Sequence, residues 1–141
     1  MTVLTRSLLV LGFVLGSSAS VWAYDMLSGL WTLKVENRSH HVVATLTVKF
    51  TTQAGRSCMF GDWLRVNVVS ATTEDLNFYP VSDPLSFHIE NNRLTIGRNE
   101  VCDAYLMLSG PANDKVVKGE YYALGLGGTS PRGFFTLSRT K

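Results

Sequence analysis

The stretch "HVVATLTVKF", residues 41–50, alternates apolar and polar side chains along most of its length. Apolar residues take every second position, at Val42, Ala44, Leu46, Val48 and Phe50, while Thr45, Thr47 and Lys49 fall between them. Successive side chains of a β-strand point to opposite faces of its sheet. The pattern therefore predicts a strand with one face in a core and the other in water.

The same two-residue period recurs through the rest of the chain. It predicts eight strands, over residues 29–36, 41–50, 63–70, 85–90, 93–97, 103–110, 116–123 and 133–140. Between them lie segments rich in Gly, Pro, Asn and Asp, among them the hairpin turn Asn91-Asn92 and the glycine-rich loop "LGLGGTSPR" at residues 124–132. Almost no helix is expected.

Eight antiparallel strands with one apolar face can hide that face by closing on themselves, which also removes unpaired edges. The short connections favour an all-β fold, an eight-stranded antiparallel up-and-down barrel, over a two-sheet sandwich. A membrane-spanning barrel would need strands of about nine to eleven residues. Residues 85–90 and 93–97 are too short for that, and the chain ends in "SRTK". We therefore expect no stable membrane insertion.

The N-terminal segment has the order of charge and hydrophobicity of a secretory signal. Arg6 precedes the apolar run "LLVLGFVLG" at residues 8–16, and small residues follow up to Ala23. We expect cleavage after residue 23, leaving one domain over 24–141 in a periplasmic or secreted location; the alternative is an N-terminal core helix.

Cys58 and Cys102 are the two cysteines of the chain. An even number of cysteines in an exported protein indicates a disulfide, and a free catalytic thiol is the alternative. Charged residues are nearly balanced, with 13 Lys and Arg against 11 Asp and Glu. Because the basic residues are scattered singly, nucleic acid is not an expected partner.

Gly29 and Trp31 form a Gly-x-Trp at the start of the first strand, and Arg139 lies in the last. This arrangement resembles the calycin group of small barrels, which includes lipocalins, avidins and bacterial periplasmic metalloprotease inhibitors. In many members a basic side chain of the last strand lies across that Trp. The resemblance implies a barrel-closing contact between Trp31 and Arg139. Avidin-type ligand residues are not recognisable, and the wide spacing of the two cysteines departs from the tighter disulfide loop of the metalloprotease inhibitors.

The motifs of common catalytic and metal sites are missing from the sequence. It has no Gly-x-Ser-x-Gly elbow, His-Glu-x-x-His helix or phosphate-binding loop, and His40, His41 and His88 do not form a metal-ligand pattern. We therefore expect no enzyme, no cofactor and no metal.

Binding remains, in two forms. The loop that carries Cys58 also contains three large apolar residues, Met59, Phe60 and Trp63. Residues of this type anchor protein interfaces, so the barrel could bind or inhibit a protein partner such as a secreted hydrolase. The alternative role of these three residues is to plug the end of the barrel. Alternatively, the barrel could carry a small apolar ligand in a cavity formed by Trp31, Phe87, Tyr105 and Tyr121, unless those side chains fill the interior.

Overall fold

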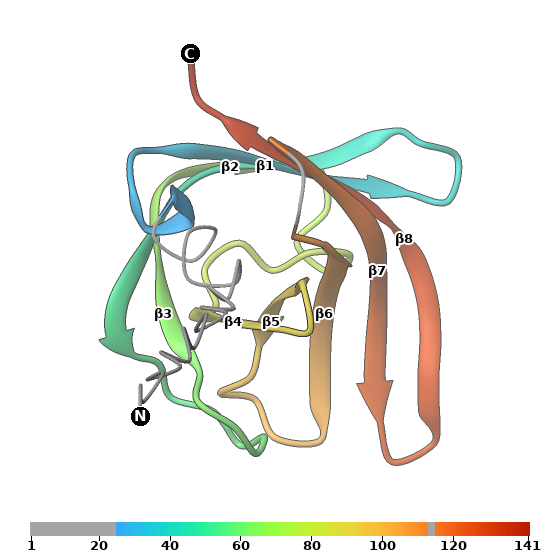
Figure 1. Ribbon diagram of the computed structural model, residues 1–141. Helices are drawn as coiled ribbons and strands as arrows, with labels where there is room; N and C mark the ends of the chain where they lie inside the picture. Colours follow the sequence, from blue (N-terminus) through green and yellow to red (C-terminus); the bar gives the residue numbers. More distant parts are fainter. Residues whose placement is uncertain (1–24, 113–114) are drawn as a thin grey trace, which may run out of the picture.

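The computed structural model describes residues 25–112 and 115–141, so the expected leader, residues 1–23, lies outside the described part. The chain forms one closed barrel in which each strand pairs with its neighbours in sequence and β8 returns to β1, as predicted (Figure 1). All pairings are antiparallel. The strands are β1 Trp31–Asn37, β2 Val42–Ala54, β3 Leu64–Thr73, β4 Leu85–Glu90, β5 Arg93–Arg98, β6 Ala104–Pro111, β7 Val116–Gly125 and β8 Gly128–Arg139.

The barrel interior contains the apolar positions that the alternation selects in most strands. Leu33, Leu46, Leu94, Ile96 and Leu137 are completely buried. Burying side chains of this size contributes about 1.5–3 kcal/mol each. The core therefore extends around the whole ring of strands.

Not every position that the alternation assigns to the inner face is buried, and on β2 a β-bulge is the reason. On β2, Val43 is buried in place of Val42, because the pairing with β1 shifts register between Val35 and Glu36. On β3, Val68 is 36% exposed although its cross-strand partner Val48 is completely buried. A bulge inserts an extra residue in one strand and so changes which side chains face inward.

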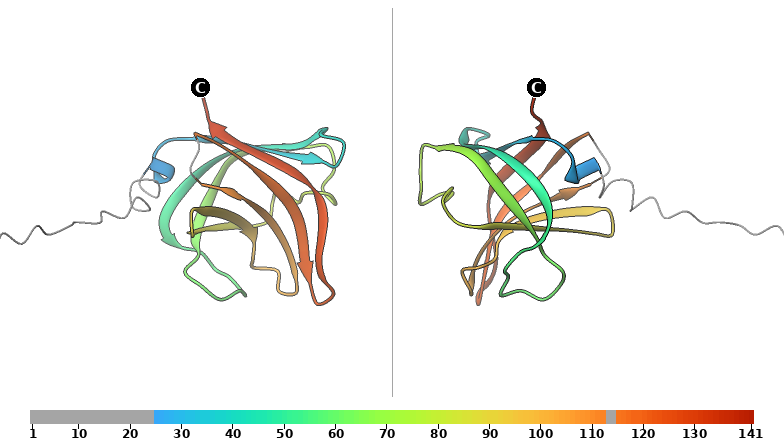
Figure 2. Two further views of the ribbon diagram at one scale, coloured as in Figure 1. Left: turned by 45° about the vertical axis from the view of Figure 1, so that its right-hand side comes forward. Right: turned by 90° about the vertical axis from the view of Figure 1, so that its left-hand side faces the viewer.

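Segments outside the strands close the two ends of the barrel. A helical turn at residues 25–27 buries Met26 in the core, and the loop over 74–84 between β3 and β4 buries Tyr79. Figure 2 shows the helical turn and this loop on opposite sides of the barrel. The Tyr121 hydroxyl donates to the Phe78 carbonyl and fixes the loop. His41, in the turn before β2, contacts the Glu74 carboxylate at 2.7 Å.

The segment predicted as a glycine-rich loop, residues 124–132, is mostly strand. Gly125 pairs with Gly128, so a two-residue turn at Leu126 and Gly127 joins β7 to β8. Gly128 has a φ of +97°, which only glycine adopts readily. β8 continues past the end of β1 to this turn, and the β7–β8 hairpin forms the right-hand wall of the barrel in Figure 1.

Candidate functional site

The loop between β2 and β3, residues 55–63, folds against the outer face of the two shortest strands. The Gly55 amide donates to the Trp63 carbonyl at its base, and the Cys58 amide donates to the Asn99 carbonyl just after β5. The predicted disulfide joins Cys58 to Cys102 in the connection between β5 and β6. The loop is thus fixed by its base and by a covalent link across β4 and β5.

Trp63 does not lie on the surface as the sequence suggested, because it is only 5% exposed. Its indole stacks on the imidazole of His88 at 4.1 Å between ring centroids, and its Nε1 donates to the Phe60 carbonyl at 3.0 Å. His88 points outward from β4, and burial lowers its pKa although the nearby Glu90 acts to raise it. Trp63 therefore supports the loop from beneath.

Phe60 is displayed at the tip of this loop. Its side chain is fully exposed, whereas its carbonyl accepts the Trp63 hydrogen bond. The neighbouring backbone is also tied, since the Met59 amide donates to Ser57 Oγ at 2.9 Å, and Met59 is half-buried. An apolar ring on a fixed backbone loses less conformational entropy on binding than one on a mobile loop.

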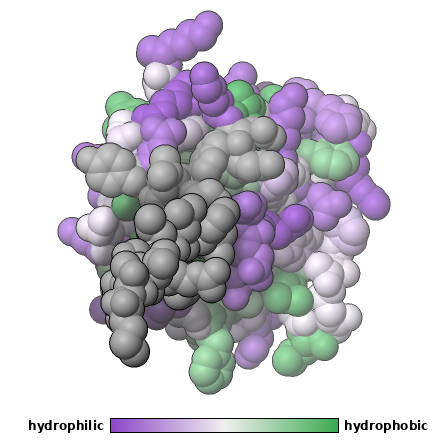
Figure 3. All heavy atoms as spheres, viewed as in Figure 1, coloured by the Kyte–Doolittle hydropathy of each residue, from purple (hydrophilic) through white to green (hydrophobic). Residues whose placement is uncertain are grey.

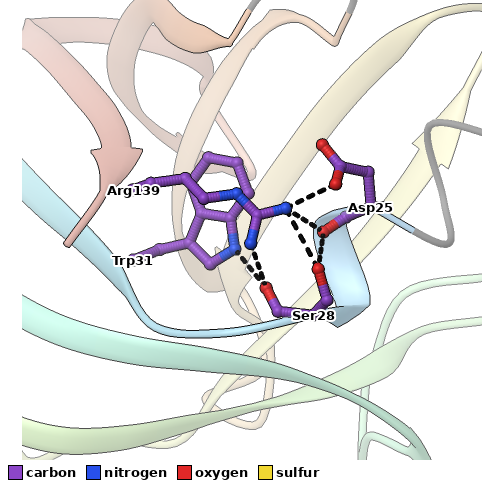
Figure 4. A network of polar contacts seen from close by, with 4 residues as sticks. All are labelled: Asp25, Ser28, Trp31 and Arg139. Atoms are coloured by element: carbon purple, nitrogen blue, oxygen red, sulfur yellow. Dashed lines mark hydrogen bonds and ion pairs between the residues drawn. The ribbon is translucent and has the colours of Figure 1, made fainter. Parts of the chain in front are cut away.

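The residues of the calycin-like motif meet as the resemblance implied. Trp31 is paired with Arg139 across β1 and β8, and the guanidinium carbon lies 4.6 Å from the indole centroid (Figure 4). The guanidinium also donates to the Ser28 carbonyl at 2.8 Å and to the Asp25 carboxylate at 2.6 Å. We call Asp25, Ser28, Trp31 and Arg139 the terminal clasp, because it joins the first and last described segments.

The aromatic residues expected around an internal cavity do not all face the same space. Trp31, Phe87 and Tyr121 are buried in the core, but Tyr105 is half-buried and alternates with the inward-facing Leu106. Tyr105 therefore lies on the outer face of β6. Phe50 packs edge-on against both Trp31 and Phe87, at 6.1 and 4.8 Å between centroids, so side chains fill this region.

The histidines hold structural contacts. His40 is exposed, contacts Glu36 Oε2 at 3.1 Å and stacks on Phe134 at 4.4 Å. Among residues 25–112 and 115–141, no group of three or more His, Cys, Asp or Glu is arranged to hold a metal ion. In the same ranges, no helix has both the length and the hydrophobicity to cross a membrane.

One surface feature carried no sequence signal. A groove on the outer wall of β5–β8 brings together Arg38, Arg93, Ser109 and Tyr122. These residues come from four separate segments, so no local motif connects them. Comparisons of the chain with models of known protein families, with characterised proteins and with solved structures found no match.

Proposed function

We propose that this protein is an exported, non-catalytic binding protein that recognises or inhibits a protein partner, such as a secreted hydrolase, through its disulfide-tethered loop at residues 55–63. The main support is that the Phe60 side chain is fully exposed while its carbonyl is held by a hydrogen bond from Trp63 Nε1. Interface hot spots are typically a few large side chains that insert into a pocket of the partner.

The surroundings of the loop support this proposal. Figure 3 shows one face that is largely hydrophilic, with separate hydrophobic spots along its lower edge, where Figure 1 places the β2–β3 loop and the β7–β8 turn. Isolated apolar residues are ordinary on a protein surface. The disulfide and the buried Trp63 beneath Phe60 distinguish this loop from an ordinary exposed turn.

We also propose that the barrel is calycin-like. The closed ring of eight strands and the stacking of Arg139 on Trp31 support this relationship. The filled interior around Phe50, Trp31 and Phe87 favours recognition at the outer surface over the carriage of an apolar ligand inside the barrel.

The experiment compares the wild-type protein with Phe60→Ala. Partners are captured from an extract of exported proteins, the captured protein is purified, and its Kd is measured by calorimetry. Truncating a hot-spot side chain costs 2 kcal/mol or more, so Phe60→Ala should weaken the complex by about thirtyfold.

Leu126→Ala is the matched control, because Leu126 is 94% exposed at the β7–β8 turn, close to the 104% of Phe60. It should bind the partner as the wild type does. Equal affinities for wild type and Phe60→Ala would contradict the proposal, as would a complex that only Leu126→Ala weakens.

A further inference from the structure

The outer wall of β5–β8 contains a groove of about 570 Å³, a size usual for a small-molecule site. Its floor follows the strand register, since Ser109 of β6 pairs with Glu120 of β7, which pairs with Phe134 of β8. At the bulge between Tyr121 and Tyr122, β8 carries one extra residue. Bulges bend the strand that holds them, which accounts for a hollow on the convex side of a barrel.

A buried hydroxyl stands at one side of this groove. Ser109 is 4% exposed although it belongs to the outer face, and its Oγ accepts a hydrogen bond from Arg93 Nε at 2.8 Å. Thr95 Oγ1 lies 3.3 Å from the same oxygen. These contacts fix the stem of Arg93 against the wall while the two terminal nitrogens of its guanidinium make no hydrogen bond within the described residues.

Two guanidinium groups line the groove without a carboxylate partner. The ion pairs of arginines within 25–112 and 115–141 are Arg98 with Asp83 and Arg139 with Asp25, so neither Arg38 nor Arg93 has one. Glu120 also lines the groove and forms no ion pair in the same ranges. The groove therefore presents two positive charges and one negative charge.

Aromatic rings complete the lining of the groove. Tyr122 and Phe134 are half-buried, and the imidazole of His40 stacks on Phe134 and holds its ring in place. Burial raises the pKa of Tyr122, Arg93 and the Ser109 hydroxyl act to lower it, and Glu120 acts to raise it. The phenol therefore stays neutral at physiological pH and can donate a hydrogen bond to an anion.

We propose that this groove binds a small organic anion consisting of a carboxylate on a ring. The carboxylate binds to the guanidinium groups of Arg38 and Arg93, which offer the planar pairs of donors that carboxylates match. The ring packs on Tyr122 and Phe134. This site is separate from the loop at residues 55–63, and the proposed function does not depend on it.

The test uses four small probes and NMR titration of the folded protein. Benzoate and glucuronate carry a carboxylate on an aromatic and on a sugar ring, and benzamide and glucose are their neutral counterparts. For ligands of this size we expect a Kd on the order of 1 mM for at least one carboxylate, with amide shifts at Ser109, Glu120 and Tyr122. The carboxylate that binds more tightly shows whether the groove accepts an aromatic ring or a sugar ring.

Each of the variants Arg38→Gln and Arg93→Gln should weaken the binding of that carboxylate about tenfold, because each removes one charged hydrogen bond. Arg65→Gln is the matched control, because Arg65 is exposed on β3 and does not line the groove. Circular dichroism checks that each variant folds.

Three results would overturn the proposal. The first is the absence of saturable shifts with either carboxylate up to about 10 mM. The second is equal binding of a carboxylate and its neutral counterpart. The third is binding that folded Arg38→Gln and Arg93→Gln retain in full.

Discussion

At the scale of single residues, Gly29 lies beside Ser28 of the terminal clasp, at a position where a side chain has little room. Its φ is +73°, and a Cβ at this position would lie 2.9 Å from Arg139 Nη1. Any other residue at this position must therefore adopt a left-handed backbone conformation, which costs about 1–2 kcal/mol. Its Cβ must also push the Arg139 guanidinium away from the Ser28 carbonyl.

We expect Gly29→Ala to lower the free energy of unfolding by about 1–2 kcal/mol, measured by urea denaturation with an unchanged m-value. Gly127→Ala is the control, since a Cβ at Gly127 meets nothing within 4 Å. Equal stability of Gly29→Ala and the control would show that the clasp tolerates a side chain there.

The sequence predicted some residue roles and missed others. Trp31 and Arg139 were paired from the resemblance, and the structure places them in direct contact. The exposed position expected for Trp63 is wrong, because its indole stacks on His88, which lies on another strand. Alternation describes which face of a strand a side chain occupies, but it cannot show that a loop folds back over that strand.

At the scale of elements, strands were predictable and the conformations of connections were not. Every expected strand exists, because alternation over several residues reports a half-buried sheet directly. The loop at 74–84 has no such period, and nothing local indicates that Tyr79 enters the core. The groove at β5–β8 depends on a bulge and on the pairing of separate strands, both of which arise only when the barrel closes.

Among the links between elements, the disulfide is expected to have the largest effect on the free energy of unfolding. Its two cysteines are 44 residues apart and link the β2–β3 connection to the β5–β6 connection. A covalent loop of this length stabilises a fold by up to about 4 kcal/mol through the entropy of the unfolded chain.

We expect Cys58→Ala/Cys102→Ala to lower the free energy of unfolding by up to about 4 kcal/mol and also to weaken a complex that depends on Phe60, because the loop loses its link. Phe60→Ala should weaken that complex without loss of stability. An untethered variant that still binds as the wild type does would show that the disulfide stabilises the barrel without organising the site.

At the scale of the whole molecule, the closure of one barrel end depends on buried tyrosines. Burial raises the pKa of Tyr121 to about 12, although Arg132 and Arg98 act to lower it. Burial is also the main cause that raises the pKa of Tyr79, with a further increase from Tyr121 and an opposing effect of Arg98. Both phenols therefore resist ionisation in the fold, whereas in the unfolded chain they ionise near pH 10.

The sign of the pH dependence follows from these directions. Between about pH 10 and 12 the folded state keeps protons that the unfolded state has lost, so the free energy of unfolding falls as pH rises, by up to about 1.4 kcal/mol per pH unit for each tyrosine. Below pH 10 both states are protonated and the contribution is complete. Urea unfolding between pH 8.5 and 11.5 measures this slope.

The double variant Tyr79→Phe/Tyr121→Phe should be less stable at neutral pH, because residue 121 loses its hydrogen bond to the Phe78 carbonyl. Its free energy of unfolding should nevertheless fall less steeply at alkaline pH. A decline as steep as that of the wild type would mean that other groups, and not the tyrosines closing this end, control alkaline unfolding.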